Sequence, residues 1–171
     1  MYRLLIIVLM SFLLLITTSC GGTSEYRLEK VQKILYDKTF QGTVNINKIA
    51  VPEVFHETLG FYDYNLYLRD AIKRQYTKSL EKCFAGGLVE KNAEYNFIIT
   101  SLDISTFPIA SVLIDIRIYL QIEIFDKRME KVKTVMIYGF GSDPNGNRAL
   151  EKAVRNSFYQ LIPPLEELFY R

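Results

Sequence analysis

The clearest pattern in the chain is the alternation of apolar and polar residues between positions 112 and 125. Every second position carries a branched aliphatic residue: Ile114, Ile116, Ile118, Leu120, Ile122 and Ile124. A period of two predicts a β-strand with one buried face and one polar face. A shift of one residue would bury the polar side chains, so we expect a firm register.

Three further strands are predicted around this one. Residues 95–105 precede it, and residues 131–140 follow it after the short polar turn 126–130, which indicates antiparallel neighbours. An earlier strand covers residues 44–51, and its apolar residues change parity at Lys48. That change predicts either a β-bulge or a strand that passes from half-buried to fully buried.

Two segments have the period of an amphipathic helix. In the first, apolar residues recur at intervals of three and four: Leu68, Ala71, Ile72, Tyr76, Leu80, Cys83 and Phe84. Asp63 or Asn65 is expected to cap its start, and Gly86-Gly87 to end it. The second helix should be capped by Asn147, and Pro163-Pro164 should kink or break it.

The element order β-α-β-β-β-α predicts an α+β fold. We expect a two-layer sandwich, in which a mixed four-stranded sheet carries two helices on one face. The predicted organisation is a signal peptide at 1–19, a lipidated cysteine with a tether and linker at 20–41, and a single sandwich domain at 42–171.

The amino-terminal residues predict export and lipid attachment. Arg3 gives a positive start, residues 4–16 are apolar apart from Ser11, and Thr17-Thr18-Ser19-Cys20 resembles the bacterial lipobox. About thirteen apolar residues suit a signal peptide and are few for a spanning helix. We therefore expect cleavage before Cys20 and a lipid on its thiol. The alternatives are an ordinary secretory signal or an uncleaved membrane helix. In either case Cys20 would carry no lipid.

The position after the lipidated cysteine bears on location. It holds Gly21 and not the aspartate that retains some lipoproteins in the inner membrane, which favours the periplasm-facing side of the outer membrane. Residues 21–24 are small and flexible, as expected of a membrane tether.

Composition excludes several classes of function. The chain has 21 Lys and Arg against 19 Asp and Glu, and only Arg3 is lost with residues 1–19, so no large field of one sign attracts nucleic acid. Once Cys20 is acylated, Cys83 has no partner for a disulfide. Cys83 lies on the apolar helical stripe, so we expect a buried structural thiol.

Candidate catalytic chemistry is sparse. His56 is the single histidine, so no second histidine completes a metal site with it. A hydrolase triad would have to include His56, and the sequence has no Gly-x-Ser-x-Gly motif for its nucleophile. Gly86-Gly87 and Gly139-Phe140-Gly141 do not continue into a phosphate-binding motif, and we interpret both as the ends of elements. We expect no catalytic residue, metal or cofactor, and hence a protein that is not an enzyme.

Binding residues are therefore sought on the surface. The connection 52–64 is rich in aromatic residues, and the polar face of the alternating strand offers a second patch. Aromatic and arginine residues outside a core often anchor partners, although they can also cover the end of the sandwich or face solvent. The candidates are Phe55, His56, Phe61, Tyr62, Tyr64, Arg117 and Tyr119.

The order of these features resembles a known family. A lipobox, Lys48-Ile49-Ala50-Val51-Pro52 on the first strand, the segment 99–108 leading into the alternating strand, Tyr138 at a strand end and a helix entered by Ala149-Leu150 are similar to the LPS-assembly lipoproteins, the LptE family. The resemblance implies a non-enzymatic plug and chaperone of an outer-membrane β-barrel, which helps to deliver lipopolysaccharide.

Other partners stay open at this point. Related shapes occur in lipoproteins that activate penicillin-binding proteins and in auxiliary lipoproteins of ABC or lipid-transport systems. In each case the lipid on Cys20 would hold the domain at the membrane beside its partner.

Overall fold

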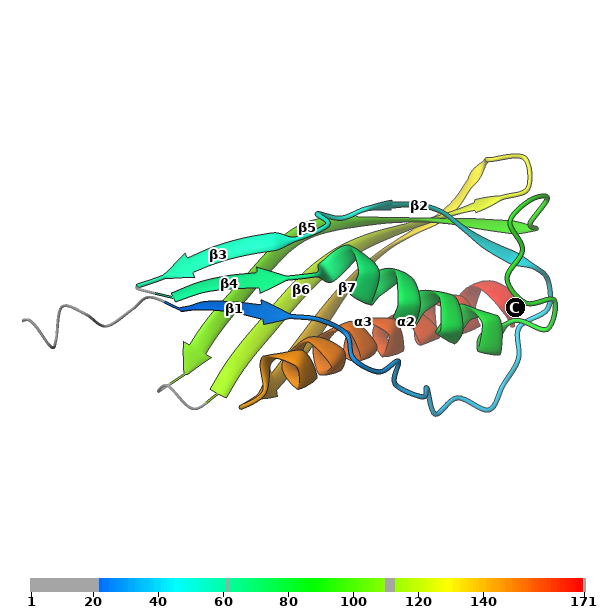
Figure 1. Ribbon diagram of the computed structural model, residues 1–171. Helices are drawn as coiled ribbons and strands as arrows, with labels where there is room; N and C mark the ends of the chain where they lie inside the picture. The colour runs from blue at the N-terminus through cyan, green and yellow to red at the C-terminus, as the bar shows by residue number, and fades with distance from the viewer. Residues whose placement is uncertain (1–21, 61, 110–112, 171) are drawn as a thin grey trace, which may run out of the picture.

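The computed structural model describes residues 22–60, 62–109 and 113–170, and its largest element is a mixed four-stranded sheet (Figure 1). The strand order is β2 (Val44–Ala50), β5 (Tyr95–Ile109), β6 (Leu113–Asp126) and β7 (Lys131–Asp143). β2 pairs parallel with β5, and the other two pairs are antiparallel. Helices α2 (Leu68–Cys83) and α3 (Gly146–Phe169) cover one face of this sheet (Figure 1). The predicted α+β sandwich is confirmed.

The register of the sheet contains three irregularities, one of which lies between Ile124 and Phe125 in the pairing of β6 with β7. The pairing of β2 with β5 shifts between Ile46 and Lys48, which confirms the bulge indicated by the parity change. A second shift, between Ser101 and Asp103, leaves Leu102 unpaired and exposed on β5. Because side chains alternate along a strand, each bulge changes which of the following residues face the core.

Helix α3 differs from its prediction at two places. Its cap is Asn145, whose side chain accepts hydrogen bonds from the backbone N–H groups of Asn147 and Arg148, so the predicted cap at Asn147 is wrong. The helix also continues through Pro163-Pro164 to Phe169, so the predicted break is wrong. Buried apolar residues lie on both sides of the prolines and hold the helix against the core: Leu161, Ile162 and Leu165.

The start of α2 also differs, because the residues before it form strands. Asp63 and Asn65 lie in β4 (Tyr62–Leu66), so neither caps the helix, which begins after Tyr67 without a side-chain cap. β4 pairs antiparallel with β3 (Phe55–Leu59) and parallel with β1 (Thr23–Tyr26). The aromatic connection predicted at 52–64 is therefore largely part of a small three-stranded sheet.

The segment between β1 and β2 packs against the domain. Residues 27–40, here called the strap, contain almost no regular structure, yet they bury Leu28, Ile34 and Phe40 in the core. The strap lies along the two helices (Figure 1). The folded region therefore includes β1 and the strap, which make up most of the segment that the sequence pattern assigns to a linker.

Side chains from both helices satisfy the backbone of the strap. Gln75 of α2 accepts a hydrogen bond from the Gln32 N–H and donates one to the Gln32 carbonyl, both at 2.9 Å. Glu151 of α3 accepts from the Lys30 N–H at 3.0 Å and from the Gln32 side chain at 2.7 Å. Further bonds to strap backbone atoms come from Arg74, Lys82, Asn147 and Tyr159. These bonds replace the ladder that a strand would supply.

Two glycines let α3 approach the sheet closely. A Cβ on Gly141 would lie 1.9 Å from the carbonyl oxygen of Ala149, and one on Gly139 would lie 2.2 Å from that of Ala153. Both glycines lie within β7, which continues to Asp143, so the interpretation of Gly139-Phe140-Gly141 as the end of an element is wrong. Their role is to bring the helix backbone against the strand.

We predict that Gly141→Ala lowers the free energy of unfolding by at least about 2 kcal/mol, because the new methyl group meets helix backbone that cannot rotate away. The measurement is urea unfolding of the detergent-solubilised protein. Ser142→Ala, at the neighbouring half-buried position, is the control and should change stability little. Equal stability of the two variants would contradict the close packing.

We also predict that Glu151→Ala lowers the free energy of unfolding by about 2 kcal/mol, because it leaves the Lys30 N–H without its charged acceptor. Amide hydrogen exchange should show faster exchange throughout residues 27–36 than in the wild type. The control is Glu130→Ala, in the exposed turn between β6 and β7. Unchanged exchange in the strap would show that these bonds do not hold it.

Candidate interaction surfaces

The four-stranded sheet turns one face away from both helices. Ile116, Ile118 and Leu120 of β6 are fully buried on the helix side, while the residues between them face outward. Arg117 and Tyr119 both lie on this outer face and are exposed, as predicted from the alternation.

Aromatic rings flank these two residues on the neighbouring strands. Tyr119 is paired directly with Tyr138 of β7, and their ring centroids are 4.7 Å apart. The Arg117 guanidinium lies 5.1 Å from the centroid of the Phe107 ring on β5 and 6.0 Å from that of Phe140 on β7. With the exposed Met136, these residues form what we call the outer patch: Phe107, Arg117, Tyr119, Met136, Tyr138 and Phe140.

The chemistry of the outer patch suits binding. Arginine, tyrosine, phenylalanine and methionine are the residue types enriched in protein interfaces. Contact with two rings orients the Arg117 guanidinium and leaves its N–H groups available to an acceptor. Met136 is 63% exposed beside them, so the surface is apolar with one fixed positive charge.

Sequence reasoning found only Arg117 and Tyr119 in this patch. The others lie at positions paired with them or next to those pairs on β5 and β7, the two strands that precede and follow β6. The pairing of β6 with β7 shifts by one residue between Ile124 and Phe125, so continuing the register of the 126–130 turn would have placed Ile137, and not Tyr138, opposite Tyr119. Phe107 could not be placed in this way, because the bulge at Leu102 changes the parity of β5.

The aromatic candidates near β3 and β4 do not form one surface. Tyr64 is buried beside Tyr26, with ring centroids 6.0 Å apart, so the prediction that it contacts a partner is wrong. Phe55 is half-buried and packs against the core. Antiparallel pairing separates these residues, because successive side chains of a strand point to opposite faces.

Two candidates of that group are exposed. His56 shares a hydrogen bond with the side chain of Asn65 across the β3–β4 pair, and Tyr62 lies where β4 begins. Phe61 and Cys20 lie outside the described residues.

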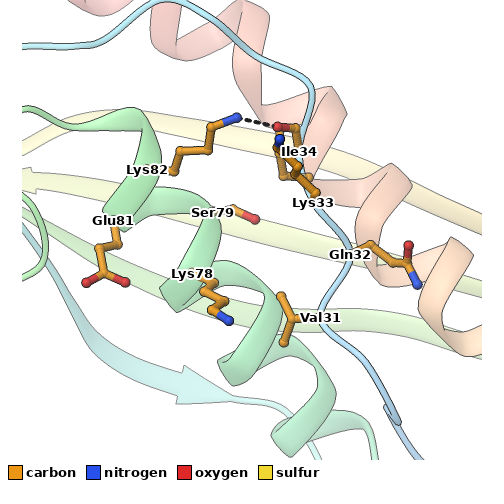
Figure 2. Close-up of a pocket in the computed structure, with 8 residues that line it drawn as sticks. All are labelled: Val31, Gln32, Lys33, Ile34, Lys78, Ser79, Glu81 and Lys82. Atoms are coloured by element: carbon orange, nitrogen blue, oxygen red, sulfur yellow. Dashed lines mark hydrogen bonds between the residues drawn. The ribbon is translucent and has the colours of Figure 1, made fainter.

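A hollow of about 410 Å³ lies between the strap and α2 (Figure 2). At one end, Lys82 reaches from the helix to the carbonyl oxygen of Ile34, at 2.6 Å. The hydroxyl of Ser79 accepts a hydrogen bond from Gln75, so it is not paired with a base that could activate it. At this end of the hollow, the hydrogen bond from Lys82 thus holds the strap against α2.

The other titratable candidates are structural. Cys83 is fully buried, and burial raises the pKa of its thiol to about 11, so at neutral pH it is protonated and unreactive, as expected of a core thiol.

Across residues 22–60, 62–109 and 113–170, no group of three or more His, Cys, Asp or Glu is placed to hold a metal ion. Within the same ranges, no helix has the length and apolar character needed to cross a bilayer.

Comparison with known proteins gives one informative result. No family model matches the chain, and no curated protein does. The chain shares its fold with a DUF330 protein. The crystal structure of XCC0632 from Xanthomonas campestris, described by the family model DUF330, superposes with a TM-score of 0.59 over 86% of this chain and 99% of that one, at 8% identity. Identity this low shows the fold alone.

This result corrects the suspected family. The structural similarity is to a DUF330 protein and not to an LPS-assembly lipoprotein, and neither family models nor curated proteins support the LptE assignment, which is therefore wrong. The resemblance rested on the order of strands and helices. Such an order is shared among families with different functions.

Proposed function

We propose that this chain is a lipid-anchored, non-enzymatic accessory protein of the bacterial cell envelope that binds a protein partner through its outer patch. The observation that carries the proposal is the aromatic and arginine cluster on the sheet face turned away from both helices. Such clusters supply most of the binding energy in many protein interfaces.

The anchor is the second part of the proposal. The sequence around Cys20 has the positive start, short apolar run and small residues of a lipoprotein signal. A lipid there would keep the patch near envelope partners and raise their effective concentration. Gly21 favours the periplasmic side of the outer membrane as the location.

A Cys20→Ser variant should leave the membrane fraction, or accumulate as an unprocessed precursor, because serine cannot form the thioether to diacylglycerol. Fractionation followed by immunoblotting measures this. Cys83→Ser, which alters the other cysteine, is the control and should remain processed and in the membrane. If Cys20→Ser were processed and retained like the wild type, the lipid anchor would be disproved.

For the outer patch, a photoreactive benzoyl-phenylalanine at Tyr119 should cross-link one envelope protein in living cells. The control position is Tyr170, which has similar exposure but lies at the carboxyl end of α3, where no cross-link is expected. The identity of the captured protein then separates a transport component from a cell-wall synthase.

The double variant Arg117→Ala/Tyr119→Ala should weaken binding to that captured partner by about 30-fold, the loss of roughly 2 kcal/mol typical of hot-spot residues. Both side chains are exposed, so the thermal midpoint should change little. Wild-type affinity in this folded variant would exclude the outer patch as the binding surface.

A further inference from the structure

The two ends of the sheet differ in chemistry. From Phe107 to Ile114, where β5 passes into β6, the sequence contains no charged residue and is apolar apart from Ser111. At the opposite end, the turn from Asp126 to Glu130 has four charged residues in five. Hairpin turns in water are normally built from Gly, Asn, Asp and Pro, so an apolar connection is costly there unless something covers it.

A second hairpin reaches the same end of the molecule. Figure 1 shows that β3 and β5 end, and β4 and β6 begin, at one end of the molecule, with the carboxyl terminus at the other. The Glu57 carboxylate of β3 accepts hydrogen bonds from the backbone N–H and the hydroxyl of Thr106 on β5, which ties the two hairpins together. Between Thr58 and Asp63 the sequence of the second hairpin is again uncharged.

Large apolar side chains are exposed at this end. Tyr62 is 51% exposed at the start of β4, and Phe107 is 42% exposed near the end of β5. Pro108 is exposed next to Phe107, and Leu59 and Leu113 are half-buried. Tyrosine is a residue type enriched at the interface between membrane and water.

The start of β1 fixes this end relative to Cys20. The carbonyl oxygen of Gly22 accepts a hydrogen bond from the Asp63 N–H at 3.1 Å, and the Tyr62 ring lies about 4 Å from the position of a Cβ on Gly22. Cys20 is two residues away, so an extended chain separates it from Gly22 by at most about 7 Å. A lipid on Cys20 would therefore enter the bilayer close to Tyr62.

We infer that the apolar end formed by Tyr62, Phe107 and Pro108 contacts the phospholipid bilayer beside the lipidated Cys20, so that the domain stands on the membrane in a fixed orientation. This inference rests on the lipid anchor of the proposed function. Contact with the interface would remove the exposed rings from water and set the long axis of the sheet away from the membrane. Apart from Phe107 at its edge, the outer patch would then lie to the side, free of the bilayer.

The absence of tryptophan from the chain allows a direct test. Single-tryptophan variants Tyr62→Trp and Phe107→Trp of the full, processed lipoprotein are reconstituted into vesicles of phosphatidylethanolamine and phosphatidylglycerol with brominated acyl chains. The matched controls are Tyr170→Trp at the opposite end, 49% exposed, and Tyr119→Trp in the outer patch. Circular dichroism and the thermal midpoint verify that each variant is folded.

We expect bromine to quench Tyr62→Trp and Phe107→Trp at least twice as strongly as either control. Equal quenching at all four positions, no quenching at the two hairpins, or stronger quenching at Tyr119→Trp would each overturn the inference. Flotation of the same vesicles separates the two proposals. Protein that floats without quenching at the hairpins contradicts only the bilayer contact, whereas protein that fails to float contradicts the lipid anchor as well.

Discussion

The pairing of β1 with β4 is the constraint on which the rest of the structure depends. Four residues of β1 align with Asp63–Leu66, and the hydrogen bonds from Asp63 to Gly22 and from Tyr67 to Tyr26 extend the contact at both ends. The strap then continues over both helices, held by their side chains. As a result, the first described residues belong to the domain, and any anchor at Cys20 is separated from it by very little chain.

A second constraint determines which surface is left for a partner. Gly139 and Gly141 bring the α3 backbone against β7, and α2 packs beside α3, so both helices occupy one face of the sheet. The opposite face keeps its own side chains, and there Tyr119, Tyr138 and Arg117 contact neighbouring rings within the sheet. Gly22, at the start of the described chain, and the outer patch therefore belong to one folded domain. Under the proposed lipid anchor, this would set the height and direction at which a partner meets the patch.

The sequence predicts the parts of this fold that have a strong period. The alternation in β6, the stripe of α2 and the parity change at Lys48 each reflect burial on one face, and the structure agrees with all three. The strand β1 is missed, because its partner β4 lies about forty positions away in the sequence. The strands β3 and β4 are also missed, although they pair with each other locally. The strap was assigned to a linker for a similar reason: its backbone partners, such as Gln75 and Glu151, are side chains distant in the sequence. Among the candidate binding residues, the predicted exposure is correct for Arg117 and Tyr119 and wrong for Tyr64. Tyr64 is covered by Tyr26, which lies on the unpredicted strand β1.

The proposed function depends most on the chemistry of Cys20. The mass of the amino-terminal tryptic peptide from membrane-purified protein tests that chemistry directly. Trypsin cuts after Arg27, so processing before Cys20 gives the peptide 20–27. We predict that this peptide carries a diacylglyceryl group on the cysteine sulfur and an acyl chain on the amino terminus. A peptide with an unmodified Cys20 thiol, whether from an uncleaved chain or from one cut elsewhere, would contradict the account.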